Sequence, residues 1–175
     1  MKLQGKNVLM VIASNNFRDE EYAEPRKVLE DAGARVTVAC STLDTAKGKL
    51  GLEVKPDVLI GDVKEGDFDG IVFVGGGGSK EYFDDPIAHK LAQGFYSHDK
   101  LTSAICIAPA ILANAGLLSG KKATSFPSSA DTLKARGAVF TNSGVESDGR
   151  IVTGSGPEAA KRFGEKLVEV LGGKK

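Results

Sequence analysis

The sequence predicts an α/β fold with a mostly parallel central sheet that is covered by helices on both faces. Short continuous runs of Val, Ile and Leu recur along the chain, as in strands that are buried on both faces. Segments with the apolar spacing of helices alternate with these runs. The length of 175 residues and the hydrophobic content of 41% suit one domain, expected over 1–171, with a flexible tail at 172–175.

The expected strands are apolar and rich in β-branched residues. They are Asn7–Ala13, Arg35–Cys40, Ile71–Val74, Leu101–Ile105 and Ile151–Gly154, with shorter strands at Leu50–Val54 (or a hairpin there), Val58–Ile60, Ala123–Ser125 and Ala138–Thr141. The expected helices are Pro25–Ala32, Ser79–Tyr96 with an interruption at Asp84–Pro86, Pro109–Ala115, Ser129–Arg136 and Glu158–Leu171. Pro25 fits a first helical turn, or a kink if that helix begins earlier.

Charge and composition exclude several classes of function. The chain has 23 basic and 23 acidic residues, mixed along its length, and no basic stripe that would indicate a nucleic-acid partner. The apolar run Val8–Ala13 is too short for a signal-peptide core or a membrane span. Two cysteines without such a signal indicate a reducing, cytoplasmic location, and no cluster has the spacing of metal ligands.

Three unusual segments each follow a predicted strand. They are the acidic run Asp19–Glu21, the glycine run Gly75–Gly78 and the cysteine Cys106. Ligands of open α/β sheets bind beyond the carboxyl ends of the strands, and parallel strands bring these three segments to one edge. Because Cys106 lies between a strand and the start of a helix, we expect a thiol pKa lowered towards the neutral range.

Each of these segments also has a purely structural interpretation. Cys106 could be an inert core thiol, and the acidic run could simply complement a helix dipole. The glycine run could be a tight turn, and its spacing matches neither phosphate-binding glycine motif. Their expected convergence at one edge favours a functional site.

The motifs AICIAP, FDGIVFVGG, FRDEEYAEP and DGRIVTGSGP together resemble the ThiJ/PfpI family along nearly the whole chain. The resemblance implies a flavodoxin-like three-layer sandwich and a homo-oligomer, with a dimer favoured. It implies that Cys106 is a nucleophile at a strained strand-to-helix turn and that Glu21 is the carboxyl group touching it. It also implies that the N–H groups of Gly75 and Ile107 bind an oxyanion, with Gly76 in the same binding loop.

The chain departs from the family pattern where histidines are expected. The protease-like branch has His where this chain has Ile107, and the deglycase branch has His where this chain has Phe126. Both histidines of the chain, His89 and His98, are expected on the surface away from the thiol. A Cys–His dyad within one subunit, and with it a PfpI-type peptidase, is therefore disfavoured.

These residues predict a cysteine-dependent stress-response enzyme that acts on small reactive carbonyls, as a glyoxalase or deglycase does, without a cofactor. One alternative is an oxidative-stress sensor in which peroxide oxidises Cys106 to the sulfenic and then the sulfinic acid. Another is a binding or chaperone-like dimer with a vestigial pocket. Cys40, which ends a different strand, is expected to lie too far from Cys106 for a disulfide.

Overall fold

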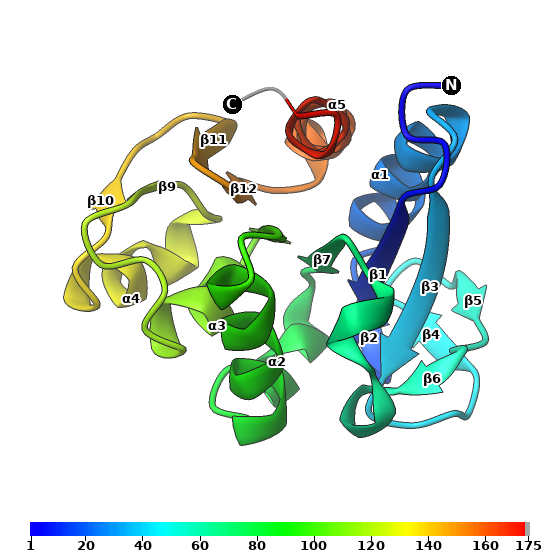
Figure 1. Cartoon of the computed structure of the whole chain (residues 1–175). Helices are drawn as coiled ribbons and strands as arrows, with labels where there is room; N and C mark the ends of the chain where they lie inside the picture. The colour runs from blue at the N-terminus through cyan, green and yellow to red at the C-terminus, as the bar shows by residue number, and fades with distance from the viewer. Residues whose placement is uncertain (174–175) are drawn as a thin grey trace.

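The computed structural model describes residues 1–173, and a mostly parallel sheet forms its centre (Figure 1). Within this part of the chain the sheet has seven strands in the order β11-β12-β8-β7-β1-β3-β6. They are β1 Asn7–Val11, β3 Arg35–Cys40, β6 Val58–Leu59, β7 Gly70–Phe73, β8 Leu101–Ile105, β11 Val145–Asp148 and β12 Ile151–Gly154. All neighbouring pairs are parallel except β11 with β12. The predicted fold class is therefore confirmed.

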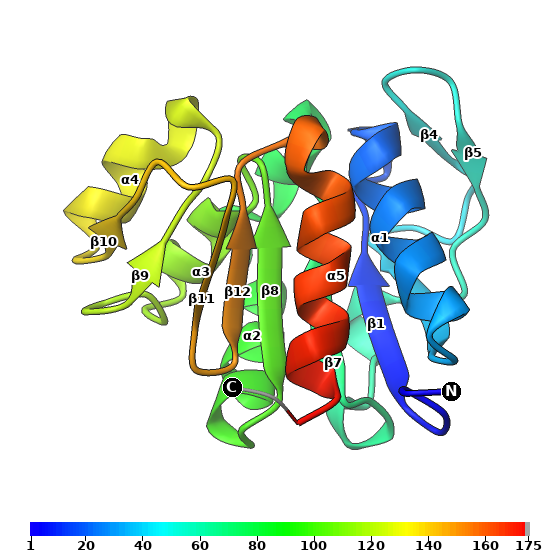
Figure 2. The same cartoon turned by 90° about the horizontal axis from the view of Figure 1, so that it is seen from above.

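Helices cover both faces of the sheet, which Figure 2 shows with α1 and α5 side by side on one face. The helices are α1 Asp19–Asp31, α2 Pro86–Ser97, α3 Pro109–Asn114, α4 Ala130–Ala135 and α5 Ala160–Leu171. In β1, Val8 and Met10 pack with the residues of α1 and α5, whereas Leu9 packs with those of α2 and α3. Side chains alternate across a strand, so one apolar run supplies two cores.

Two small sheets flank the central one. In one, β2 Asn15–Phe17 pairs in parallel with β4 Ala46–Gly48, which pairs antiparallel with β5 Glu53–Val54. In the other, β9 Lys122–Ala123 pairs in parallel with β10 Val139–Phe140. The first small sheet lies beside the start of α1, and the second lies beside α4 (Figure 2).

The structure differs from the sequence-based expectations mainly at element ends. Helix α1 begins at Asp19 instead of Pro25, because the acidic residues form its first turn, and Pro25 lies inside the helix. The expected helix over 79–96 is divided into a 3-10 segment, Gly77–Tyr82, and α2, which Asp85 caps through the Ile87 N–H at 3.2 Å. Strand β11 was not predicted.

The chain end lies beyond α5. In the expected tail, Gly172 and Gly173 close the last helical turn through N–H bonds of 2.9 and 3.1 Å to Val168 and Val170. Lys174 and Lys175 lie outside the described residues. None of the helices between residues 1 and 173 combines the length and the apolar character that crossing a bilayer requires.

Candidate functional site

Cys106 lies at the carboxyl end of β8 in a strained backbone conformation. Its φ is +67°, in the left-handed region that residues with a Cβ rarely occupy. Such a conformation costs about 1 to 3 kcal/mol and persists only where the surroundings hold it. Here the Cys106 N–H donates to Gly154 O at 2.9 Å, and the Phe126 N–H donates to Cys106 O at 2.7 Å. The strained strand-to-helix turn implied by the resemblance is therefore present.

The glycine run brings backbone against both the thiol and the carboxyl group. A Cβ built on Gly75 would lie 2.6 Å from the Cβ of Cys106 and would overlap Oε1 of Glu21. At Gly76 φ is +98°, and a Cβ there would lie 2.7 Å from the backbone carbon of Phe17. Both positions therefore require glycine. The position of a Cβ on Gly75 touches both the Glu21 carboxyl group and the Cys106 side chain, so these two side chains lie close together beside Gly75.

The three acidic residues at the start of α1 point in three directions. Asp19 accepts the Leu50 and Leu52 N–H groups at 3.0 and 2.9 Å and so anchors the turn after β4. Glu20 forms a two-bond ion pair with Arg18, at 2.8 and 3.1 Å. Only Glu21 enters the core, where its side chain is fully buried. Helix dipole complementarity alone does not explain the burial of Glu21.

The Glu21 carboxyl group holds a proton more tightly than an ordinary glutamate. Burial raises its pKa from 4.5 to about 7, although the neighbouring Cys106 and the positive charge of Arg18 act in the opposite direction. Neither carboxyl oxygen has a hydrogen-bond partner of good geometry among residues 1–173. With a pKa of about 7, the Glu21 carboxyl group can give or take a proton near neutral pH.

The expected low pKa of Cys106 is wrong. Burial, and next the negative charge of an ionised Glu21, raise the thiol pKa from 9.0 to about 12, while the Gly76 and Ile107 N–H groups lower it. The side chain is only 8% exposed, and the helix that follows is the short α3 of six residues. Loss of water around the sulfur outweighs what two N–H groups and a short helix supply.

One assignment of backbone donors also changes. The N–H groups that contact the Cys106 sulfur belong to Gly76 and Ile107, whereas the Gly75 N–H contacts the Glu21 carboxyl group. Gly75 was expected beside the oxyanion, together with Ile107. The Gly75 carbonyl accepts the Arg18 N–H at 3.0 Å, which joins the glycine loop to the start of α1. All five expected site residues still lie within this one cluster.

Comparison with known proteins identifies the family of this chain. A model of the DJ-1/PfpI family matches residues 6–170. The chain belongs to the DJ-1/PfpI family. An uncharacterized protein of Methanocaldococcus jannaschii is 40% identical over 97% of this chain and 84% of its own length. A deglycase of Pyrococcus horikoshii is 29% identical over 93% of this chain and 98% of its own.

A solved structure extends the similarity to three dimensions. The crystal structure of a ThiJ/PfpI domain protein from Brachyspira murdochii superimposes with a TM-score of 0.94 at 35% identity. The match covers 98% of this chain and all of the other. The family resemblance expected from the motifs is therefore confirmed along the whole chain.

The remaining candidate groups of this DJ-1/PfpI member are engaged elsewhere. His89 bonds to the Phe83 carbonyl at 2.7 Å, and the exposed His98 pairs with Glu65. Cys40 ends β3, three strands from β8, so it lies roughly 14 Å from Cys106 at about 4.8 Å per strand. Both thiols are free. Within residues 1–173 no cluster of three or more His, Cys, Asp or Glu side chains could hold a metal ion.

Sequence reasoning missed two residues that shape the site. Arg18, the residue before α1, contributes a positive charge to both Glu21 and Cys106. Asp19 anchors the turn after β4 at the start of the same helix. The FRDEEYAEP motif contains both residues, and the family resemblance singles out Glu21 in it. Nothing in the local pattern gives Arg18 or Asp19 its role.

Proposed function

We propose that this protein is a cysteine-dependent enzyme that converts small reactive carbonyl compounds, as a glyoxalase or deglycase does. One observation carries the proposal: a strained cysteine, a buried carboxyl group and two backbone N–H donors converge at one sheet edge. Cys106 is the nucleophile in this proposal, and Glu21 is the general base and acid. The N–H groups of Gly76 and Ile107 are the oxyanion donors.

In the reaction of a 2-oxoaldehyde, the Glu21 carboxylate would take the proton of the Cys106 thiol as the sulfur adds to the substrate. The sulfur electron pair forms a bond to the aldehyde carbon, and the carbonyl electrons move onto oxygen, beside the two N–H groups. The hydrogen on the aldehyde carbon then moves as a proton to the neighbouring carbonyl carbon through an enediol, which leaves a thioester. One carbon is oxidised as its neighbour is reduced, so no external oxidant is needed.

Water completes the cycle. It attacks the thioester carbon, the carbon–sulfur bond breaks, and the sulfur regains a proton from Glu21. The products are a 2-hydroxy acid and the free enzyme. The cycle consumes only substrate and water, in agreement with the expectation that no cofactor is required.

The protonation states support this division of roles. At neutral pH the thiol holds its proton, whereas Glu21, with a pKa of about 7, is partly ionised. A carboxylate beside the thiol can take the proton as the carbon–sulfur bond forms, so a free thiolate is not required beforehand. A general base works best with a pKa near the working pH.

The Pyrococcus horikoshii relative bears the name deglycase, which supports the same class of chemistry. An amine adduct of the aldehyde would first break its carbon–nitrogen bond, with the hydroxyl proton passing to the amine as the aldehyde C=O re-forms. The free aldehyde would then follow the same route. A role in the stress response, a cytoplasmic location and a homodimer remain predictions.

The test is methylglyoxal conversion by purified variants. We expect Cys106→Ala to lose at least about a hundredfold in kcat/KM, as removal of a nucleophile does. Cys40→Ala is the matched control, since this buried thiol belongs to β3 and lies away from the site. Cys106→Ala that converts methylglyoxal as fast as the unchanged protein would refute the proposal.

The sensor alternative has weaker support. Oxidation by peroxide proceeds through the thiolate, and burial holds the Cys106 thiol pKa well above neutral. A protonated Glu21 could still donate a hydrogen bond to a sulfinate. Mass spectrometry after mild peroxide separates the two functions: oxidation that stops at the sulfinic acid, in a protein without methylglyoxal conversion, would favour the sensor.

A further inference from the structure

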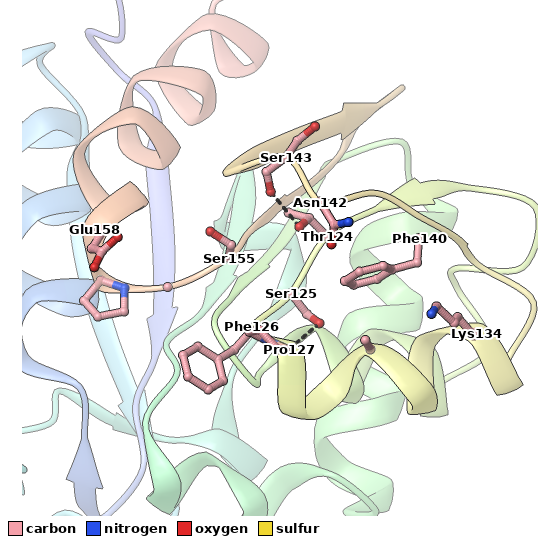
Figure 3. A pocket seen from close by; sticks show the side chains of 13 residues that line it. Thr124, Ser125, Phe126, Pro127, Lys134, Phe140, Asn142, Ser143, Ser155 and Glu158 are labelled. Carbon is pink, nitrogen blue, oxygen red and sulfur yellow. Dashed lines mark hydrogen bonds between the residues drawn. The ribbon is translucent and has the colours of Figure 1, made fainter.

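A cavity of about 470 Å³ lies beside the turn that carries Cys106, and Figure 3 shows the side chains that line it. Its walls come from residues 124–127, from α4 and the segment around β10, and from the 155–158 segment between β12 and α5. Neither Cys106 nor Glu21 lines it, so the steps described above leave it unused. A volume of this size is typical of small-molecule sites and exceeds what a compound as small as methylglyoxal fills.

Two walls of this cavity are joined to the backbone of Cys106 by hydrogen bonds. Phe126, on one wall, donates its N–H to the Cys106 carbonyl at 2.7 Å. On the other side Cys106 donates to Gly154 at 2.9 Å, and residues 155–158 continue directly from Gly154. The two walls approach again farther out, because a Cβ on Gly156 would lie 3.6 Å from Cδ1 of Phe126. One wall of the cavity is therefore hydrogen-bonded directly to the Cys106 backbone, and the other begins at the residue after one that is.

The lining is suited to an apolar group. Two phenylalanine rings, Phe126 and Phe140, face the cavity with Pro127 and Pro157 (Figure 3). The Thr124 and Ser125 hydroxyls donate to backbone carbonyls at 2.7 and 2.8 Å, so the protein itself uses these two donors.

Charged groups stand at the ends of the cavity. Lys134 and Glu158 lie at opposite ends in the view of Figure 3. The Lys134 ammonium group lies 5.5 Å from the centre of the Phe140 ring. Between these ends lie the two rings and the prolines on one side, and the polar residues Asn142 and Ser155 on the other.

We propose that this cavity binds the non-reacting substituent of the substrate and that the preferred substituent is an aromatic or bulky apolar group. The substrate class is then the 2-oxoaldehydes that carry such a group, with the aldehyde at Cys106 and the substituent between Phe126 and Phe140. This inference rests on the carbonyl chemistry proposed above. No bond forms or breaks in the cavity, and the covalent steps at Cys106 are the same for every substituent.

The experiment compares kcat/KM for phenylglyoxal and methylglyoxal, from initial rates. Burying an aromatic ring favours the larger substrate by about 10- to 100-fold. Ala130→Phe, at the start of α4, places a ring inside the cavity, and we expect it to lower the phenylglyoxal-to-methylglyoxal ratio about tenfold. The intrinsic reactivity of the two aldehydes is the same for every variant, so a change in the ratio reports on the cavity.

Ala135→Phe is the matched control, because Ala135 is exposed on the same helix and does not line the cavity. Its ratio should equal that of the unchanged protein. If Ala130→Phe does not fold by circular dichroism, Phe140→Ala removes one ring of the cavity and should lower the ratio in the same direction.

The outcomes separate this inference from the proposed function. Conversion of both aldehydes with a ratio that no cavity variant alters would overturn the cavity assignment and leave the carbonyl chemistry standing. A protein that converts neither aldehyde would overturn both. A ratio that falls in Ala130→Phe and not in Ala135→Phe supports both.

Discussion

Replacing Glu21 by glutamine should stabilise the folded protein at alkaline pH while abolishing carbonyl conversion. The folded protein holds the Glu21 proton with a pKa of about 7, against 4.5 for an unperturbed glutamate. A carboxyl group whose pKa is raised on folding stabilises the fold fully below the unfolded value. That stability is lost as the pH rises from about 4.5 to about 7. At 1.36 kcal/mol per pKa unit, the loss is roughly 3 kcal/mol.

The assay is urea unfolding of the unchanged protein and of Glu21→Gln at pH 5 and pH 8, at one protein concentration. Glutamine cannot ionise, and a small part of the loss has already occurred at pH 5. We therefore expect the variant to gain roughly 2.5 kcal/mol relative to the unchanged protein between pH 5 and pH 8. In thermal unfolding this gain corresponds to a relative shift of roughly 5 to 10 °C for a chain of this size. Any packing cost of the amide is the same at both pH values and cancels.

Glu24→Gln is the matched control, because Glu24 is exposed on the same helix. Its stability relative to the unchanged protein should not depend on pH in this range. Surface substitutions scatter by about 0.5 kcal/mol. If Glu21→Gln gains less than this between pH 5 and pH 8, the claim that Glu21 is a buried carboxyl group with a raised pKa is refuted.

Three further predictions concern the same edge of the sheet. The kcat/KM for methylglyoxal should rise with pH through about 7, because the Glu21 carboxylate must accept the thiol proton. A pH–rate profile without that rise would contradict the role of Glu21 as the base. Gly75→Ala should lower the free energy of unfolding in urea by about 1 to 3 kcal/mol and remove most of the activity, because a Cβ there overlaps the Glu21 carboxyl group. Gly66→Ala is the control: no atom lies within 4 Å of its added carbon, so its stability and activity should stay near those of the unchanged protein. Asp19→Ala should lower the free energy of unfolding by about 1 to 3 kcal/mol and speed hydrogen exchange of the Leu50 and Leu52 amides, which Asp19 binds. If these amides exchange equally fast in Asp19→Ala and in the exposed control Asp44→Ala, Asp19 does not hold the turn after β4.

Much of the site's location is readable from the sequence. The strands Leu101–Ile105 and Ile151–Gly154 have the predicted bounds, because a continuous apolar run records burial on both faces of a sheet. The order of the motifs then places Cys106, the glycine run and the acidic run at one edge, since the carboxyl ends of parallel strands coincide. These inferences need only the local pattern and the parallel connectivity.

Helix boundaries follow the sequence less closely. The pattern Val28, Leu29 and Ala32 predicts the second half of α1. The first half has only two adjacent apolar residues among four charged ones, which is not a helical spacing. What stabilises that first half is the packing of Tyr22 and Glu21 against residues that are distant in the sequence. A local pattern does not contain such contacts.

The sequence by itself determined the fold class, the family, and the presence of a cysteine, a glycine loop and carboxyl groups at one edge. Only the tertiary structure decided that Glu21 is the fully buried one of three adjacent acidic residues, and that Gly76 supplies an N–H near the sulfur. It also reversed the expected direction of the Cys106 pKa and revealed the cavity beyond Phe126. The physical reason is that desolvation, side-chain direction and empty space arise where remote segments pack together, whereas apolar runs and motif order are properties of the chain itself.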